Sequence, residues 1–437
     1  MKETPVDKTI VERIIKESGI PPIKKASIRE IVNLVNQIEK ETKTRFIHLE
    51  MGVPGLPASE VGVQAEIEAL KKGVASIYPN IDGIPELKDE GSRFIKMFLD
   101  IDVEARGIIP SVGSMQGSMA AIMIANRCNK KKNRTLFIDP GFPVQKQQHQ
   151  ILGIKYESFD VYHYRGEKLR EKIESYLQKG NISTIIYSNP NNPSWICFHN
   201  KELQIIGELA TKYDVVVIED LAYFAMDFRS DYSKPGVPPF QPSVAKYTDN
   251  YVLLVSSSKV FSYAGQRVGI IVIGNKLYSR NFPDLKRFYS SDKFGYVIVH
   301  GVIYALSAGT THSSQFAMAA MLKAASDGTY NFVDSVKEYG ERARQMKDLF
   351  IKNGFRIVYD MDEDLALADG FYFTVSYRNM IGPKLVETLL YYGISALPLS
   401  VTGSVHSDGL RVCVSQVTKE NISDLQSKLE KFNANHS

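Results

Sequence analysis

Short apolar runs in the middle of the chain predict buried β-strands. Five runs carry apolar side chains at most of their positions, and they are residues 136–138, 184–187, 215–218, 252–255 and 270–273. Such runs are typical of strands that helices cover on both faces. Between them, residues 169–177 and 203–213 repeat their apolar side chains with helical spacing. We therefore expect an α/β domain whose mostly parallel sheet is covered by helices.

The N-terminal segment predicts two amphipathic helices. Apolar residues from Ile10 to Ile15 share one helical face, and Ser27 with Glu30 forms a capping box at the start of a second helix. These helices precede the first strand of the α/β region, so we expect them to belong to a separate, smaller domain.

The C-terminal part mixes helices and strands, as a smaller α+β domain does. Its pattern predicts a charged helix over about 331–353, a strand over 371–375 and a last helix after Thr418. Both chain ends would then build the small domain around a large central one. The expected bounds are 1–55 for the N-terminal part of the small domain, 56–330 for the large domain and 331–437 for the C-terminal part of the small domain.

Composition describes an ordinary globular protein and favours no macromolecular partner. Apolar residues make up 44% of the 437 positions and charged residues 23%, which argues against disordered, collagen-like or coiled-coil chains. The formal net charge is only +4, too small at this size to indicate nucleic acid as the main partner.

No segment has the character of a membrane span or a signal peptide. The longest stretch without a charged residue, 294–322, is broken up by glycine, histidine and other polar residues, so we expect a buried segment. Residues 1–19 mix charged with apolar side chains, unlike a secretion signal. The three cysteines lie far apart and predict reduced, structural thiols. We expect a cytoplasmic protein without a membrane partner.

Chemically useful side chains follow four of the predicted strands. They occur in the segments 139–142, 188–193, 219–223 and 256–259, which supply an aromatic ring, amides, a carboxylate with a phenol, and a lysine. The carboxyl ends of parallel strands meet at one edge of a sheet, where ligands of α/β proteins bind. We therefore expect these groups to gather at that edge.

This set of groups suits pyridoxal phosphate, a planar phosphorylated aldehyde. A lysine forms a Schiff base with it, and a carboxylate keeps its pyridine nitrogen protonated so that the ring accepts electrons. Small polar residues and backbone N–H groups hold the phosphate. Arg267, in Gly265-x-Arg267-x-Gly269, would add a charge-assisted phosphate contact.

At this point the sequence resembles a known family, the class I/II (fold-type I) pyridoxal-phosphate-dependent aminotransferases of the aspartate aminotransferase-like superfamily. The core of the resemblance is Ser256-x-Ser258-Lys259 followed eight residues after the lysine by Arg267. Asn-Pro and Asp-x-x-Tyr motifs precede it in the family's order, and matched motifs run from Gly52 to Arg411. The resemblance thus covers nearly the whole chain.

The resemblance implies roles for the residues near the cofactor. Lys259 would be the Schiff-base lysine and proton carrier, and Asp220 the partner of the pyridine nitrogen. Asn192 and Tyr223 would bind the ring's 3-oxygen, and Phe142 would stack on the ring. The phosphate would be held by residues of a glycine-containing loop and of the lysine motif, namely Gly113, Ser114, Met115, Gln116, Ser256, Ser258 and Arg267.

The resemblance also implies how the substrate and a second subunit bind. Arg411 would grip the substrate α-carboxylate in a bidentate fork, with Asn192 and the backbone of Gly52 beside it. Tyr78 would reach the phosphate of a neighbouring subunit, so the expected active unit is a homodimer.

Three segments depart from the family pattern. Trp195 stands where that pattern commonly has glycine, so either the turn differs or Trp195 points into or beside the site. The segments 399–408 and 290–296 match no pattern, which leaves side-chain specificity open. The histidines show no metal-ligand spacing, and we expect no metal.

The leading functional prediction is an aminotransferase that moves an amino group between an L-amino acid and a 2-oxo acid by a ping-pong mechanism. The same cofactor could instead serve a carbon–sulfur β-lyase or an amino-acid decarboxylase, because the pocket selects which bond breaks. A third alternative is a transcriptional regulator built on such a domain. About fifty residues precede Gly52, too few for the required DNA-binding domain beside the expected helices.

Overall fold

The computed structural model describes residues 3–20 and 22–437 and divides into two compact units. One unit consists of Met1–Gly55, Asn192–Ile196 and Lys337–Ser437, and the other of Leu56–Asn191 and Cys197–Val336. We call them the terminal unit and the central unit. These units differ from the expected domains in two ways. The central unit extends to Val336 rather than to residue 330, and the segment Asn192–Ile196 within it belongs to the terminal unit.

Packing explains both differences. Phe332 belongs to the central unit because its ring packs against Phe94 and Phe261, at centroid distances of 5.6 and 5.4 Å. The helix expected from 331 consequently begins only at Glu338. The segment Asn192–Ile196 joins the terminal unit because Trp195 packs on Tyr372 there.

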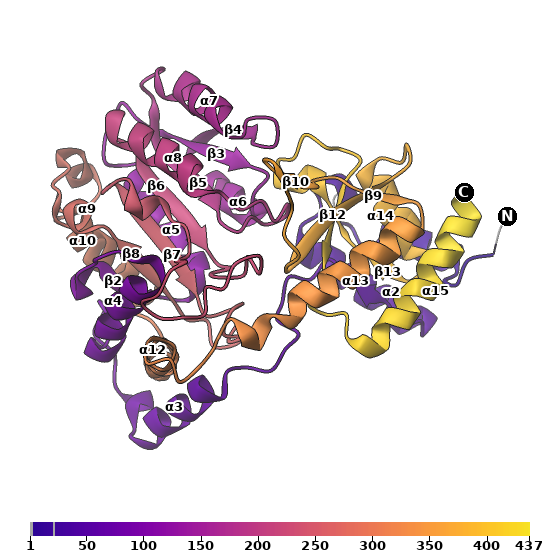
Figure 1. Ribbon diagram of the computed structural model, residues 1–437, viewed down its shortest axis with the longest axis horizontal. Coiled ribbons are helices and arrows are strands. Elements are labelled where there is room, and N and C mark those ends of the chain that lie inside the picture. Colours follow the sequence, from indigo (N-terminus) through magenta and orange to yellow (C-terminus); the bar gives the residue numbers. More distant parts are fainter. Residues whose placement is uncertain (1–2, 21) are drawn as a thin grey trace. The chain divides into compact units, whose positions relative to one another are not determined.

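A seven-stranded sheet forms the middle of the central unit (Figure 1). Its spatial order is β2-β8-β7-β6-β5-β3-β4. The block from β4 to β7 is parallel, whereas β8 runs antiparallel to both β7 and β2. The bounds are β2 (Ile108–Ser111), β3 (Arg134–Asp139), β4 (Lys155–Asp160), β5 (Ile182–Ser188), β6 (Val216–Leu221), β7 (Tyr251–Ser256) and β8 (Gly269–Ile273). All five apolar runs are strands of this sheet, so the predicted mostly parallel sheet is confirmed.

Helices supply the apolar layers against this sheet. Alanines and isoleucines of α5 and the buried valines and isoleucines of the π-helical segment Val297–Ile303 share one core with strand residues such as Ile218 and Leu254. Much of the uncharged stretch 294–322 is therefore buried, as expected, but residues 304–307 within it are exposed. Figure 1 shows α7 and α8 side by side near the sheet. The helices are α3 (Glu60–Lys71), α4 (Pro85–Leu99), α5 (Gly113–Ala125), α6 (Pro143–Leu152), α7 (Glu167–Leu177), α8 (Asn200–Lys212), α9 (Asn275–Ser279), α10 (Phe294–Tyr296), α11 (Tyr304–Ser307) and α12 (His312–Ser326).

The terminal unit contains an antiparallel sheet with the order β14-β15-β12-β9. A short parallel pair, β1 with β13, links the N-terminal segment to this part of the chain. The strands are β1 (Ile47–His48), β9 (Phe355–Ile357), β10 (Met361–Asp362), β11 (Leu365–Ala366), β12 (Tyr372–Tyr377), β13 (Ile394–Ser395), β14 (Leu397–Pro398) and β15 (Leu410–Cys413).

The first two helices of the terminal unit form where the sequence predicts them. Ser27 Oγ accepts from Glu30 N–H at 3.3 Å and Glu30 Oε2 accepts from Ser27 N–H at 2.7 Å, so the predicted capping box is confirmed. Apolar side chains of the first two helices pack with Leu390 and Leu397 in one core. The helices are α1 (Lys8–Glu17), α2 (Ile28–Thr42), α13 (Glu338–Lys352), α14 (Gly382–Leu390) and α15 (Lys419–His436).

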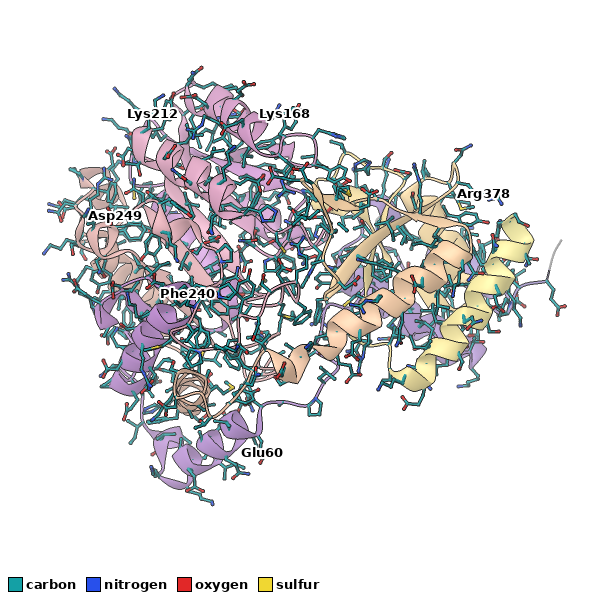
Figure 2. All side chains as sticks on the ribbon, viewed as in Figure 1. Glu60, Lys168, Lys212, Phe240, Asp249 and Arg378 are labelled. Atoms are coloured by element: carbon teal, nitrogen blue, oxygen red, sulfur yellow. The ribbon has the colours of Figure 1, made fainter. Side chains whose placement is uncertain are left out.

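Charged side chains cover the outside of the elements. Lys168, Lys212 and Asp249 are exposed, in contrast to the buried strand residues (Figure 2). Among residues 3–20 and 22–437, no helix is long and apolar enough to cross a membrane.

Candidate active site

The carboxyl ends of β5, β6 and β7 lie next to one another in the central unit. Asp220 of β6 is paired with Ser188 of β5 on one side and with Leu254 of β7 on the other. Two residues beyond Leu254, β7 ends at Ser256 and leads into the turn that carries Lys259. The side chains that follow these strands therefore gather at one sheet edge, as the sequence predicts.

Asp220 is a buried carboxylate with neutral hydrogen-bond donors. Its Oδ2 accepts from Gln145 Nε2 at 2.9 Å, and its Oδ1 accepts from the backbone N–H of Ala222 at 3.1 Å. Burial raises the pKa of Asp220 to about 6, although these two hydrogen bonds and the charge of Lys259 act in the opposite direction. At neutral pH the carboxylate is thus ionised and close enough to Lys259 to interact with its ammonium.

The turn that carries Lys259 is fixed by hydrogen bonds of its serines. Ser257 Oγ donates to the carbonyl of Val268 at 2.6 Å, and Ser256 Oγ accepts from the backbone N–H of Ser258 at 3.1 Å. The backbone N–H of Ser262 donates to the carbonyl of Lys259 at 3.1 Å. This turn holds the Lys259 backbone, and the half-buried side chain extends from it.

Arg267 lies against the N-terminus of α5. A Cβ on Gly113 would lie 2.5 Å from Arg267 Nη2, and a Cβ on Gly269 would lie 3.3 Å from the backbone nitrogen of Ser114. The first turn of α5 contains no acidic residue, and no side chain caps it. Backbone N–H groups at a helix N-terminus attract anions, and a guanidinium next to them strengthens that attraction. The arrangement fits a phosphate group.

Two other residues of this predicted loop are engaged within the protein. Gln116 accepts from the backbone N–H of Val112 at 2.8 Å and donates to Ser307 Oγ at 2.6 Å. Met115 is partly exposed, and its carbonyl accepts from Gln148 Nε2 at 2.9 Å. The Gln116 side chain therefore fixes the loop, while its backbone belongs to the first turn of α5.

Three aromatic residues of the prediction lie in different settings. Phe142 is half-buried and directly precedes α6, the helix that carries Gln145. Tyr223 is buried two residues after β6. Tyr78, in contrast, is 88% exposed, so it lies on the surface of this chain.

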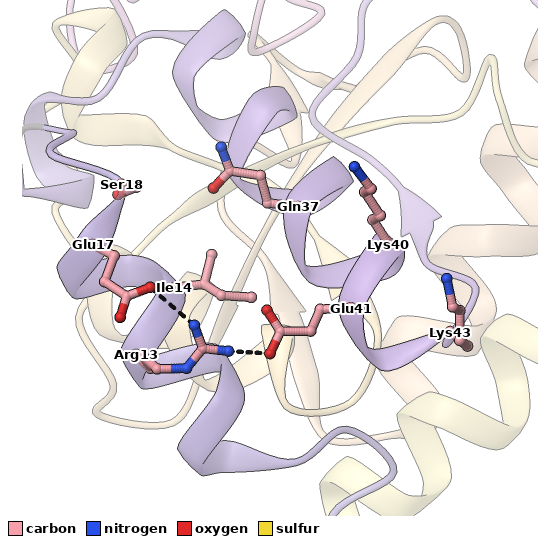
Figure 3. Close-up of a pocket in the computed structure, with 8 residues that line it drawn as sticks. All are labelled: Arg13, Ile14, Glu17, Ser18, Gln37, Lys40, Glu41 and Lys43. Carbon is pink, nitrogen blue, oxygen red and sulfur yellow. Dashed lines mark hydrogen bonds and ion pairs between the residues drawn. The ribbon is translucent and has the colours of Figure 1, made fainter.

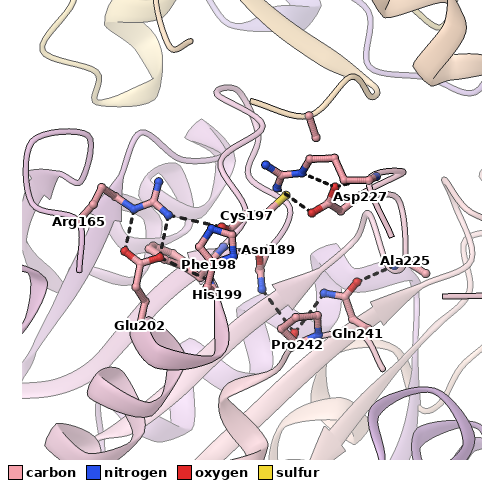
Figure 4. Close-up of polar contacts among 12 residues, drawn as sticks. Arg165, Asn189, Cys197, Phe198, His199, Glu202, Ala225, Asp227, Gln241 and Pro242 are labelled. Carbon is pink, nitrogen blue, oxygen red and sulfur yellow. Dashed lines mark hydrogen bonds and ion pairs between the residues drawn. The ribbon is translucent and has the colours of Figure 1, made fainter. Parts of the chain in front are cut away.

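Polar contacts hold the segment after β5 in place (Figure 4). Asn189 Oδ1 accepts from the backbone N–H of Phe198 at 3.0 Å. Farther along, Arg165 forms two hydrogen bonds of 2.8 and 2.7 Å with the carboxylate of Glu202. Its Nη2 also donates to the carbonyl of Cys197 at 3.4 Å. Arg165 thereby links the end of the 189–197 loop, at Cys197, to Glu202 of α8.

A second buried carboxylate, Glu219, precedes Asp220. It accepts from Ser243 Oγ at 2.5 Å, from the Val244 backbone N–H at 3.1 Å and from the Tyr187 hydroxyl at 3.2 Å. Complete burial raises its pKa to about 7 despite these donors. Its hydrogen bonds tie the turn at 243–244 to strands β5 and β6.

Arg411 occupies the middle of the antiparallel sheet in the terminal unit. The side chain is 1% exposed. Its Nη1 donates to Asn192 Oδ1 at 3.2 Å, and its Nη2 donates to the carbonyl of Glu50. The guanidinium also lies 4.6 Å from the ring centroid of Tyr372. The structure thus brings together Arg411 and Asn192, both predicted to bind substrate.

Gly52, the third predicted substrate residue, also contacts Tyr372. A Cβ at Gly52 would lie 2.2 Å from the Tyr372 hydroxyl oxygen. No larger residue fits there without displacing the tyrosine. Arg411, Asn192, Gly52 and Tyr372 therefore form one cluster within the terminal unit.

Trp195 resolves the question raised by its replacement of glycine. It adopts φ of 66°, the left-handed region that favours glycine, and its side chain is completely buried. Its ring centroid lies 6.2 Å from that of Tyr372. A Cβ at Gly370 would lie 2.0 Å from the indole. The turn thus has a backbone conformation that glycine favours, and the indole packs next to the Arg411 cluster.

Three residues of these clusters have no signal in the sequence. Gln145 is identified only by its hydrogen bond to Asp220, and Glu50 only by its carbonyl, which any residue carries. Tyr372 lies in a predicted strand, but its contact with Arg411 depends on the pairing of β12 with β15. Such pairings between distant segments have no local sequence signature.

A separate hollow of about 540 Å³ lies between α1 and α2 (Figure 3). Arg13 forms ion pairs there with Glu17, at 2.9 Å, and with Glu41. No residue predicted for the site lines this hollow.

Neither metal ligands nor disulfides occur in the described parts of the chain. Residues 3–20 and 22–437 contain no group of three or more histidine, cysteine or acidic side chains that could hold a metal ion. Cys128, Cys197 and Cys413 are buried and form no disulfide with one another, as predicted.

Comparisons with known proteins identify related sequences and a shared fold. The sequence profile of the family described as "Aminotransferase class I and II" matches residues 44–429. A "Probable aspartate aminotransferase" of Methanocaldococcus jannaschii is 26% identical over 255 residues, which are 58% of this chain and 62% of that protein. An "Asparagine--oxo-acid transaminase" of Streptococcus mutans is 23% identical over 232 residues, 52% of this chain and 56% of that protein. The chain thus matches less than two thirds of the length of either relative.

Among solved structures, an alanine aminotransferase from Pyrococcus furiosus superposes with a TM-score of 0.75 at 18% identity. The match covers 96% of this chain and 99% of that structure. It shows that the two proteins share a fold.

Proposed function

Because the chain belongs to the class I and II aminotransferase family, we propose that it is an enzyme that transfers an amino group between an L-amino acid and a 2-oxo acid. Enzymes of this family use pyridoxal phosphate, which, when bound, withdraws electrons from the substrate α-carbon. The observation that carries the proposal is the pair of Lys259 and the buried, ionised Asp220 at the carboxyl edge of the parallel sheet.

Lys259 and Asp220 have the chemistry that this reaction needs. The Lys259 amine would attach the cofactor covalently and would then carry the proton that leaves the substrate α-carbon. The Asp220 carboxylate, held by neutral donors, would accept a hydrogen bond from the protonated pyridine nitrogen. Removal of this carboxylate from water makes its attraction to a cation stronger than it would be at the surface.

The other predicted cofactor residues would hold the ring and the phosphate. The first turn of α5, from Gly113, and the Arg267 guanidinium would bind the phosphate, with help from Ser256 and Ser258. Phe142 would stack on the ring. The polar side chains of Tyr223 and Asn192 would bind the ring's 3-oxygen, as the resemblance implies.

Arg411 would bind the substrate α-carboxylate. Its guanidinium is already oriented by Asn192 and Glu50, so less entropy is lost when a carboxylate binds. The backbone at Gly52 would lie beside the carboxylate. The two relatives and the solved structure described above carry three different substrate names, so the reaction class is better supported than any particular amino acid.

We further propose a homodimer in which Tyr78 reaches the neighbouring cofactor phosphate. Tyr78 and the adjoining Ile77 are 88% and 58% exposed, and exposed apolar side chains of this kind are typical of interaction surfaces. Sedimentation should report a dimer, and Tyr78→Ala should weaken cofactor retention. The three cysteines form no disulfide, which is compatible with the reducing cytoplasm that we propose as the compartment.

The β-lyase, decarboxylase and regulator alternatives are not favoured, because the family match and the named relatives are all aminotransferases. The test is a panel of amino acids offered one at a time to the purified holoenzyme without an oxo acid. An aminotransferase releases about one equivalent of oxo acid per subunit and then stops. Continuous release of ammonia or carbon dioxide would contradict the proposal.

A further inference from the structure

We propose that Tyr372 and Trp195 are positioning residues for Arg411, so that the affinity for the substrate carboxylate depends on an edge-to-face aromatic pair whose Tyr372 ring lies against the guanidinium. The inference rests on the proposed role of Arg411 in binding that carboxylate. It adds residues that the family motifs do not contain, one of which, Trp195, stands where the family pattern commonly has glycine.

The strand register explains why Tyr372 reaches Arg411. Arg411 of β15 pairs directly with Thr374 of β12, and Tyr372 of β12 pairs with Cys413 of β15. Directly paired residues point to the same face of a sheet, and positions two apart on a strand share that face. Tyr372 is thus the diagonal neighbour of Arg411, a position within reach of aromatic and long side chains.

Two hydrogen bonds and an aromatic ring hold the guanidinium. Nη1 and Nη2 each donate to a neutral oxygen, of Asn192 and of Glu50, while Cζ lies over the Tyr372 ring, 4.6 Å from its centroid. Nε is buried and donates to no protein atom. Since neutral groups orient the charge without cancelling it, Arg411 keeps its attraction for an anion.

Trp195 supports both contacts of Arg411. Its indole packs at an interplanar angle of 67° against Tyr372, the edge-on geometry that aromatic pairs favour. Three residues earlier, Asn192 accepts the hydrogen bond from Arg411. The bare backbone of Gly370 gives the indole its space, because a Cβ there would lie 2.0 Å from the ring. A buried tryptophan therefore fixes both the segment that carries Asn192 and the edge of the Tyr372 ring.

The ring face, rather than the hydroxyl, should carry the effect of Tyr372. The attraction between a guanidinium and an aromatic face grows when water is excluded, and both groups are about 1% exposed. Its loss should weaken carboxylate binding by roughly 10- to 30-fold. Phenylalanine retains the face and should retain the affinity.

The experiment compares variants of the holoenzyme in carboxylate binding. Tyr372→Leu should raise KM for the amino acid by about 10- to 30-fold while kcat changes less than about threefold. Trp195→Leu should raise KM by the smaller factor of roughly 3- to 10-fold, because Trp195 acts on Arg411 only through Tyr372 and Asn192. In Tyr372→Phe, KM should stay within about twofold of the wild-type value.

Two further ligands separate positioning from general damage. The inhibition constant of a simple carboxylate should rise in parallel with KM, whereas binding of the amine that lacks the carboxylate should not change. Tyr377→Leu is the matched control: Tyr377 is also a buried tyrosine of β12, but its hydroxyl donates to Asn433 and its ring packs on Phe355 and Phe432. It should lower stability without this selective change.

Unchanged carboxylate affinity in folded Tyr372→Leu would overturn the inference, as would an equal loss for the carboxylate and the amine. If Tyr372→Leu does not fold, unchanged carboxylate affinity in Trp195→Leu overturns it. Arg411→Gln separates the proposed role of Arg411 from the proposed roles of Tyr372 and Trp195. If this variant keeps its carboxylate selectivity, the proposed role of Arg411 fails; if it loses selectivity while Tyr372→Leu keeps it, only the present inference fails.

Discussion

The two candidate clusters hold opposite charges by the same means. In the central unit, the Asp220 carboxylate receives hydrogen bonds from an amide side chain and a backbone N–H. In the terminal unit, the Arg411 guanidinium donates to an amide side chain and a backbone carbonyl. Each charge is buried and oriented by neutral groups, so each remains available to an oppositely charged ligand.

The clusters differ in how the chain builds them. Asp220 and Lys259 follow parallel strands, whose carboxyl ends meet wherever the sheet forms. Arg411 lies inside an antiparallel strand, and its partners come from three separate segments. The comparison teaches that a site at strand ends follows from topology alone, whereas the arginine site depends on exact register and side-chain packing.

The largest effect should come from Lys259. Lys259→Ala removes both the covalent link to the cofactor and the proton carrier, and should lower kcat/KM by about 10⁴-fold or more. The visible absorbance of the bound cofactor should shift in the same variant. Lys276→Ala, which removes an exposed lysine of the same unit, is the control. Loss of activity in both variants, or in neither, would contradict the assignment.

Asp220→Asn should have the next largest effect on activity, about 10²- to 10³-fold on kcat, because it removes a preorganised charge. Its effect on stability should have the opposite sign. The pKa of Asp220 is raised by burial to about 6 from an ordinary value of 3.8, so the folded cofactor-free protein retains a proton that the unfolded chain has lost. Between about pH 4 and 6 the stability contribution of this group therefore falls as pH rises.

Denaturation of the cofactor-free proteins measures that second effect. At pH 7.5, Asp220→Asn should be more stable than the wild type by roughly 2–3 kcal/mol, and the difference should shrink toward pH 4. Asp249→Asn, at an exposed site, should show neither change. A variant less stable than the wild type at pH 7.5 would mean that Asp220 serves the fold rather than a cation.

Arg411→Lys should affect substrate binding and spare the cofactor. Lysine keeps the charge but loses the planar fork, so KM for amino acids should rise by about 10²-fold. The cofactor absorbance should be unchanged, which separates this cluster from the Asp220 cluster. Equal losses of cofactor and substrate affinity would contradict the division of roles.

The smallest expected effect concerns the support of Glu50, whose carbonyl accepts from Arg411. The Glu50 carboxylate is held by His48 Nδ1 at 2.9 Å and by Ser395 Oγ, and His48 Nε2 lies 3.4 Å from Glu39. Burial lowers the pKa of His48. The hydrogen bonds that His48 forms with Glu50 and Glu39, and the negative charges of these two residues, outweigh the effect of burial, so the pKa is raised overall.

His48 therefore binds its proton more tightly in the folded state. This stabilisation is fully present below the unfolded pKa near 6.5 and is lost as pH rises through the folded pKa. His48→Gln should remove it, by roughly 1 kcal/mol or less. Urea denaturation of both proteins at pH 6 and pH 8.5 checks this prediction, and a wild type that gains stability relative to the variant at pH 8.5 would contradict it.

An element is predictable from the sequence where its burial or its motif leaves a local pattern of residues. The run 252–255 is apolar because both faces of β7 are covered, and Lys259 follows it in a motif. Strand β4 was not predicted, because Lys155–Asp160 is a largely polar edge strand with exposed and half-buried positions. Helix α13 begins later than predicted, since Phe332 is buried in the central unit.

The residues of the candidate site also fall into those that the sequence predicts and those that only the folded chain brings together. Asp220, Lys259 and Arg267 were predictable because motif order and strand ends identify them. Gln145 and Tyr372 were not, because an amide one turn into α6 and a tyrosine diagonal to Arg411 become partners only in the folded chain. The positive φ of Trp195 is indicated only by the family pattern, which commonly has glycine at this position.

The most direct test of the central claim follows nitrogen through a complete turnover. The holoenzyme is incubated with a nitrogen-15-labelled amino acid, chosen from the panel, and an oxo acid of different carbon skeleton. An aminotransferase that depends on Lys259 delivers the label to the second skeleton, and Lys259→Ala does not. Label released as free ammonia, or equal transfer by the variant, would contradict the account.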